Sequence, residues 1–125
     1  MTAGAPEEAR AQPPVTVDEL LRLVHKKAKE VDTSRIAYAF MKMNVRRTRP
    51  LVEAARYCLA LRELGLPISA PLLSALLQRS YAMTLDMLHN LGDKHVLVFK
   101  RGRAYRAHFE WEISPVFLKY YEGKA

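Results

Sequence analysis

The chain has 125 residues and a formal net charge of +7 at pH 7, with half of its residues apolar and about a quarter charged. This size is expected of one compact domain, and the composition is ordinary for a soluble globular protein. The single cysteine, Cys58, excludes an internal disulfide and favours a reducing, cytoplasmic setting. No apolar run approaches the roughly 20 residues that cross a bilayer, so we expect neither a membrane-spanning segment nor a signal peptide.

The positive charge is concentrated in two blocks of the sequence. Residues 35–56 carry six cations and one acid, and residues 94–109 carry five cations and no acid. Clustered cations suit a polyanionic partner, because each neutralised phosphate releases condensed counterions. The alternative is a basic surface that is simply solvated.

The chain begins with a segment that has no structural periodicity. Residues 1–14 contain Ala, Pro and Glu, and we expect a disordered tail there. Thr16 and Glu19 then have the spacing of a capping box, and an apolar repeat typical of an amphipathic helix follows. We expect His25 on the polar face of this helix, as a surface residue. With a second helix capped near Asp32, it would form an N-terminal extension over residues 15–45.

The second expected helix has more apolar surface than one buried face requires. Its buried line would be formed by Ile36, Phe40 and Met43, while Tyr38 and Met41 lie beyond that line. A helix enclosed in the monomer core and a contact between subunits both fit this excess.

A basic segment over residues 44–50, the connector, precedes the third expected helix. Pro50 suits the first turn of that helix, and Gly65 suits its end because glycine accepts a left-handed backbone. Cys58 falls on the apolar face and is expected to be a small buried hydrophobe rather than a reactive thiol.

Residues 69–91 predict two short helices separated by a tight break. Ser69 and Ser80 are placed to cap them through their hydroxyl groups, and Gly92 would end the second helix. The buried stripe of the second helix is expected at positions i, i+4 and i+7, which are Tyr81, Leu85 and Leu88.

After this second helix the apolar period changes from 3.6 to 2. Residues 96–99 predict a strand, and Gly102 sits in a basic turn. On the return strand Trp111 and other apolar residues alternate with polar ones. If the turn consists of Arg101 and Gly102 alone, His95 and His108 would face each other across the hairpin, most simply as a solvated pair.

Ser114 and Pro115 predict a cap and first turn for a short final helix over residues 114–122. The aromatic surface of this helix could pack back on the domain or pair with a second subunit. Because the second helix also has surplus apolar surface, we expect a homodimer.

The order helix, tight turn, helix and cation-tipped hairpin over residues 50–113 resembles the winged helix-turn-helix family of nucleic-acid-binding domains. The resemblance implies a mainly α fold with a two-stranded β-hairpin, here with two extra N-terminal helices and a short C-terminal helix. It also implies that residues 80–91 enter a major groove and that residues 100–106, the wing, contact the flanking backbone.

Motifs that would indicate catalysis are missing from the sequence. There is no phosphate-binding glycine loop, no nucleophile elbow and no H-x-x-x-H pair. We therefore expect a protein that is not an enzyme, with no catalytic residue, metal, cofactor or small-molecule substrate.

The second helix of the pair departs from the residue types that read bases directly. Asn90 is the one outward residue of a typical base-reading type, and Asp86 would repel phosphates. Binding to the DNA backbone is therefore better supported than recognition of a particular sequence. The outward positions are expected to be Ala82, Met83, Asp86, His89 and Asn90.

The function that these observations favour is binding of double-stranded DNA by a nucleoid-associated regulator of transcription or a chromosome-associated protein. The alternatives are a winged-helix adaptor in a transcription, replication or ribosomal complex, and RNA binding. Low Asn and Gln content with abundant Arg and Ala is typical of a thermophile. The candidate DNA-binding residues are Arg46, Arg47, Arg49, Arg79, Ser80, Tyr81, Met83, Lys100, Arg101, Arg103 and Arg106.

Overall fold

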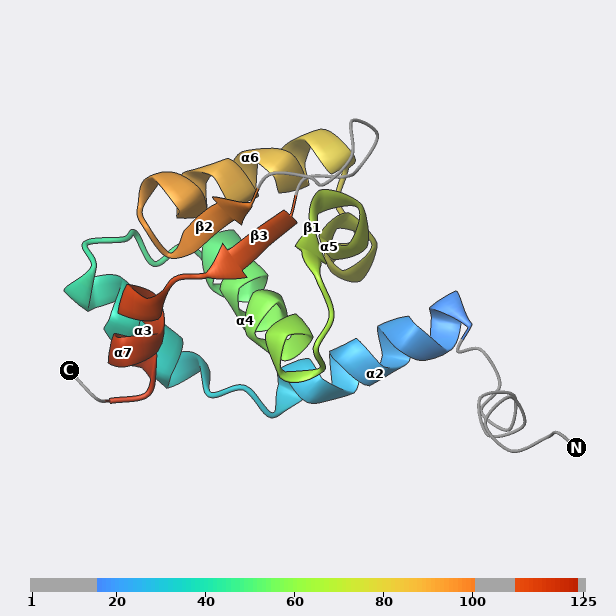
Figure 1. The fold of residues 1–125 in the computed structure, drawn as a ribbon, viewed down its shortest axis with the longest axis horizontal. Helices are drawn as coiled ribbons and strands as arrows, with labels where there is room; N and C mark the ends of the chain where they lie inside the picture. The colour runs from blue at the N-terminus through green and yellow to red at the C-terminus, as the bar shows by residue number, and fades with distance from the viewer. Residues whose placement is uncertain (1–15, 101–109, 124–125) are drawn as a thin grey trace, which may run out of the picture.

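The computed structural model describes residues 16–100 and 110–123, which are mainly helical with a small three-stranded antiparallel sheet (Figure 1). The expected tail, residues 1–14, lies outside the described residues. In chain order the elements are α2 (Val17–Lys29), α3 (Thr33–Lys42), α4 (Arg49–Glu63), β1 (Ile68–Ser69), α5 (Ala70–Leu77), α6 (Tyr81–Asp93), β2 (Leu97–Lys100), β3 (Glu110–Ile113) and α7 (Pro115–Tyr121).

Local sequence signals determine where the first three of these helices begin and end. The Thr16 hydroxyl accepts from the Glu19 backbone N–H at 3.1 Å, and the Glu19 carboxylate accepts from the Thr16 N–H at 3.0 Å, so the predicted capping box is confirmed. Asp32 caps α3, and Pro50 lies in the first turn of α4, as predicted. Gly65 follows α4 with φ of 72°, a backbone conformation that favours glycine.

Helix α4 lies in the middle of the fold, with α6 on one side and α2 on the other (Figure 1). Eight of its fifteen residues are buried. Cys58 is among them, and burial raises the pKa of its thiol to about 12. The prediction that Cys58 is a small buried residue is therefore confirmed, and its raised pKa favours the unreactive thiol form.

Helix α7 packs against α3, so aromatic side chains of the C-terminal segment are buried within the chain. The rings of Phe40 and Phe117 meet edge to face, with centroids 6.1 Å apart, and both side chains are fully buried. Tyr38, Met41 and Val116 remain exposed. The homodimer stays a prediction, but much of the apolar surface on which it was based is buried in the monomer.

His25 was predicted to be a surface residue, and this was wrong. Its Nδ1 lies 2.6 Å from the hydroxyl oxygen of Tyr57, so the two side chains share a hydrogen bond between α2 and α4. The rings also meet edge to face at 5.3 Å. His25 directly follows the buried Val24, so its side chain lies beside the buried face of α2 and can reach α4.

The sheet has three strands, so the prediction of a two-stranded hairpin was incomplete. Residues Ile68 and Ser69 form β1, which pairs with β3 and gives the strand order β1-β3-β2. A two-residue strand is too short to produce an alternating pattern in the sequence. Ser69 precedes α5 as predicted, but its hydroxyl makes no capping hydrogen bond.

The register of β2 with β3 also differs from the expected one. A turn of Arg101 and Gly102 alone would place Lys100 opposite Arg103, whereas Lys100 lies opposite Glu110. Nine residues therefore separate the paired strand ends, and the suggested pairing across the hairpin does not follow from this register. His108, the other histidine of that pair, lies outside the described residues. The alternation of exposed glutamates with buried Trp111 and Ile113 on β3 is confirmed.

Gly92 does not end α6, which continues to Asp93; the left-handed residue is His95, with φ of 66°. Gly92 instead makes room for a ring. A Cβ atom at this position would lie 2.7 Å from Cζ3 of Trp111, which is buried beneath α6 between His89 and Phe99. The absence of a side chain at Gly92 thus allows the sheet to approach the helix closely.

We expect Gly92→Ala to destabilise the protein by about 1 kcal/mol. Alanine favours a helix over glycine by about 1 kcal/mol, but overpacking against a buried ring costs about 1–3 kcal/mol. Urea unfolding followed by circular dichroism would measure the change.

The control is the same substitution in a Trp111→Phe background, because phenylalanine lacks the indole carbons that approach Gly92. There Gly92→Ala should be neutral or stabilising. An equal loss of stability in both backgrounds would mean that the ring contact does not explain the glycine.

Candidate nucleic-acid interface

The start of α6 is fixed by a sharp turn and a cap. Gln78 ends α5 in the left-handed region with φ of 55°, which confirms the predicted break. The Ser80 hydroxyl accepts from the Met83 N–H at 3.1 Å, as predicted for the cap. The Thr84 hydroxyl donates to the Ser80 carbonyl at 2.9 Å, which adds a second bond to this turn.

The buried face of α6 differs from the predicted stripe. Thr84, Leu88 and Leu91 are buried, whereas Tyr81 is 53% exposed. Thr84 was overlooked because it is polar, but its hydroxyl is satisfied by the backbone and can be buried without an unpaired group. Tyr81 is the first residue of the helix, and its apolar character alone did not indicate burial.

The outward face of α6 is as predicted. Met83 is 51% exposed, and Ala82, Asp86, His89 and Asn90 are also exposed. With Tyr81 on the outside, the first turn of the helix presents two large side chains to solvent. The candidate residues Ser80, Tyr81 and Met83 therefore lie together at one end of α6.

Four of the arginines predicted to bind DNA are exposed and form no ion pair with a described carboxylate. Arg79 immediately precedes the Ser80 cap, and the other three lie in the connector before or at the start of α4. None of the four forms an ion pair with a carboxylate of the described residues. The four are Arg46, Arg47, Arg49 and Arg79.

The basic hairpin is described only in part. Lys100 ends β2, and its Nζ lies 3.0 Å from a carboxylate oxygen of Glu112, so much of its charge is offset. Both side chains are about half exposed, and such a pair contributes little to stability. Arg101, Arg103 and Arg106 lie outside the described residues.

The connector has a fixed path rather than a loose one. Asn44 takes a left-handed backbone with φ of 60°, and Val45 is buried while its N–H donates to the Phe40 carbonyl at 2.8 Å. The Thr48 hydroxyl caps α4 by accepting from the Leu51 N–H at 3.4 Å. Between these anchors Arg46 is held on the surface.

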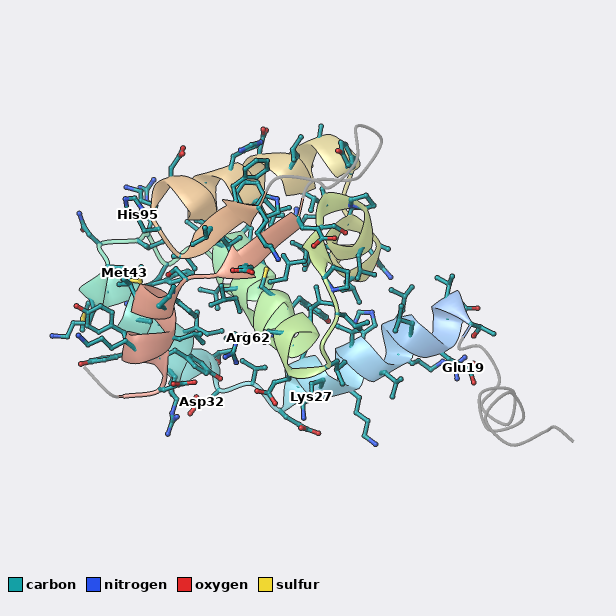
Figure 2. The ribbon with its side chains drawn as sticks, in the orientation of Figure 1. Glu19, Lys27, Asp32, Met43, Arg62 and His95 are labelled. Atoms are coloured by element: carbon teal, nitrogen blue, oxygen red, sulfur yellow. The ribbon has the colours of Figure 1, made fainter. Side chains whose placement is uncertain are left out.

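The structure brings the connector beside the C-terminal end of α6. Figure 2 labels Met43 and His95, which mark the ends of α3 and α6 in this region. A cleft of about 650 Å³ lies between the connector, with the start of α4, and the C-terminal half of α6. It is lined by Asn44, Val45, Arg46, Thr48, Pro50, Leu51, Met87, Asn90 and Lys94.

Sequence reasoning missed Lys94 and Asn44 as parts of this surface, and it named Asn90 as an outward residue without assigning it to the site. Lys94 was counted in the basic block but not assigned to the site, and nothing in the sequence brings residue 46 near residue 94. The one available signal was that the chain has only two asparagines, and both line the cleft. Two of the candidate cations, Arg79 and Arg46, thus lie at opposite ends of α6.

Other kinds of site are not supported within residues 16–100 and 110–123. There, no group of three or more His, Cys, Asp and Glu residues is arranged to hold a metal ion, and no helix is long and apolar enough to cross a membrane. Comparisons with protein-family models, curated proteins and solved structures give no significant match.

The two serines that precede α5 and α6 provide a matched pair of substitutions. Ser80→Ala should destabilise the protein by about 1 kcal/mol, because a capping hydrogen bond is lost. Ser69→Ala should change stability much less, because its hydroxyl does not cap α5. Chemical denaturation of both variants would measure the difference, and equal losses would contradict the role given to the Ser80 cap.

Proposed function

We propose that residues 50–113 form a winged helix-turn-helix domain that binds double-stranded DNA, chiefly through the phosphate backbone. The proposal is supported by the order of the elements, in which α4, β1, α5 and α6 are followed by the paired strands β2 and β3. The strand β1 joins the same sheet by pairing with β3. In this arrangement α6 is the helix that would lie on DNA.

The observation that carries the proposal is the exposed face of α6, whose two ends carry cations that pair with no carboxylate of the described residues. Arg79 lies beside the capped start of the helix, where backbone N–H groups also favour an anion. Arg46 and Lys94 lie at the other end, on the cleft between the connector and α6. Clustered cations without carboxylate partners suit a polyanion.

The face between these cations favours backbone binding over base reading. Met83 is apolar and Asp86 is acidic, so neither makes the bidentate contacts that Arg, Asn or Gln make with bases. Asn90 lies near the C-terminal end of the helix and lines the cleft. The proposed role is therefore that of a chromosome-associated protein or regulator with weak sequence preference.

A protein-binding adaptor is the second candidate. It is favoured by Tyr81 and Met83, two large side chains that are about half exposed in the first turn of α6. Aromatic and methionine side chains are common anchors of protein interfaces. The substitution of Asp86 distinguishes the two candidates.

Asp86→Asn should tighten binding to a short DNA duplex, because it removes repulsion between a carboxylate and nearby phosphates. The gain should be largest at low salt, since salt screens exposed charges. Fluorescence anisotropy with a labelled duplex would measure it across a salt series. The control is Asp18→Asn, which makes the same chemical change on α2, the helix on the other side of α4 from α6 (Figure 1).

Equal affinity of Asp86→Asn and the wild-type protein at low salt would indicate that α6 does not lie on DNA. The adaptor would then be favoured, and Met83→Ala should weaken binding to its protein partner. Both positions are exposed, so neither substitution should lower the melting temperature appreciably.

Arg101→Ala combined with Arg103→Ala should weaken binding to all DNA sequences alike. Each lost phosphate contact lowers the slope of log affinity against log salt by about 0.9, so the pair should lower it by about two. Lys29→Ala combined with Lys119→Ala removes the same charge from α2 and α7 and serves as control. If the wing variant has the same salt slope as the wild-type protein, the wing does not contact the DNA.

A further inference from the structure

The cleft between the connector and α6 has an unusual set of polar side chains. It is lined by two cations, two amides and one hydroxyl group, and no carboxylate of the described residues lines it. Asp86 and Asp93, the acids of α6, are outside its lining. The chain has two asparagines, and both line this cleft.

We propose that this cleft binds a phosphate group of the nucleic-acid backbone. The proposal rests on the proposed function. It adds a second point of contact between the protein and the DNA backbone, at the C-terminal end of α6. The groups that would hold the phosphate are Arg46, Lys94, Asn44 and Asn90.

The chemistry of these groups selects an anion that accepts hydrogen bonds. Arginine, lysine and the amide nitrogens of asparagine are donors, and they reach the cleft from two different elements. A cationic ligand would find no carboxylate in this lining. A phosphate offers several oxygen acceptors in different directions, and arginine binds such oxygens in a bidentate manner.

The walls of the cleft are held in place before any ligand binds. Val45 is buried and Thr48 caps α4, so the connector that carries Arg46 cannot swing freely. The helix α4 begins at the cleft with its positive end, whereas α3 and α6 end there with their negative ends, so the helix dipoles offset one another and the side-chain donors supply the attraction for an anion.

The apolar part of the lining favours a nucleotide phosphate over free inorganic phosphate. Leu51, Met87 and Pro50 belong to the same cleft. An inorganic ion would leave this surface exposed to water, whereas a sugar ring next to the phosphate would cover part of it.

The position of the cleft fits a duplex that lies along α6. A helix of 13 residues is about 20 Å long, which exceeds the roughly 12 Å width of the major groove. Contacts near Arg79 at one end and at the cleft at the other can therefore reach the backbones on both sides of one groove.

Nuclear magnetic resonance of the ¹⁵N-labelled chain tests the proposal directly. The chain has two asparagines and two glutamines, so its side-chain amide signals are few and can be assigned by substitution. Addition of a short duplex should shift the side-chain amide signals of Asn44 and Asn90, while that of Gln12, which precedes α2 in the sequence, should move little. Inorganic phosphate should shift the same two signals only at much higher concentration.

A pair of substitutions provides the second measurement. Arg46→Ala combined with Lys94→Ala should lower the salt slope of duplex binding by about two, near 0.9 for each cation. The Lys29→Ala and Lys119→Ala control should leave the slope nearly unchanged. All four side chains lack carboxylate partners among the described residues, so the variants should melt at similar temperatures.

The outcomes separate this inference from the proposed function. If the wild-type protein binds the duplex but both asparagine signals stay in place and the slope is unchanged, the cleft is not a phosphate site, while DNA binding stands. Shifts with inorganic phosphate but none with bound duplex would also overturn the inference. If the wild-type protein binds no duplex even at low salt, the proposed function and the inference fail together.

Discussion

The constraint on which this fold depends is the burial of α4 on nearly every side. The helices α2, α3, α5 and α6 and the strands β1 and β3 all pack against it. Its core face includes small residues such as Ala54, Cys58 and Ala60, which let the neighbouring elements approach closely. Because all of these elements share one surface, the two N-terminal helices contribute Val24 and Ile36 to the same core as the rest of the chain.

A second contact ties the sheet to α6. Trp111 lies under the helix where Gly92 has no side chain, and its ring meets those of His89 and Phe99. The indole N–H has no hydrogen-bond partner among the described residues, so packing alone holds the ring. The orientation of α6 is therefore determined at both ends, by the Ser80 cap at its start and by Trp111 near its end.

Features that depend on residues close together in the sequence could be predicted from it. Features that depend on contacts between distant segments could not. The caps at Thr16 and Ser80 involve residues three positions apart, and such signals are readable without a fold. The strand β1 exists only because β3 lies beside it, and His25 is half-buried only because Tyr57 faces it. The meeting of Arg46 with Lys94 in one cleft likewise depends on packing between α4 and α6.

Under the proposed function, the length of α6 determines whether the charges at its two ends attract phosphates together or independently. Its ends are about 20 Å apart, while the screening length at physiological salt is about 8 Å. Arg79 at the start and Lys94 at the end therefore attract phosphates almost independently, and their contributions to affinity should add. Neither cation cancels the local repulsion between Asp86 and a nearby phosphate. A helix with this distribution of charge holds a polyanion at its two ends, and such binding depends on the spacing of phosphates rather than on the identity of bases.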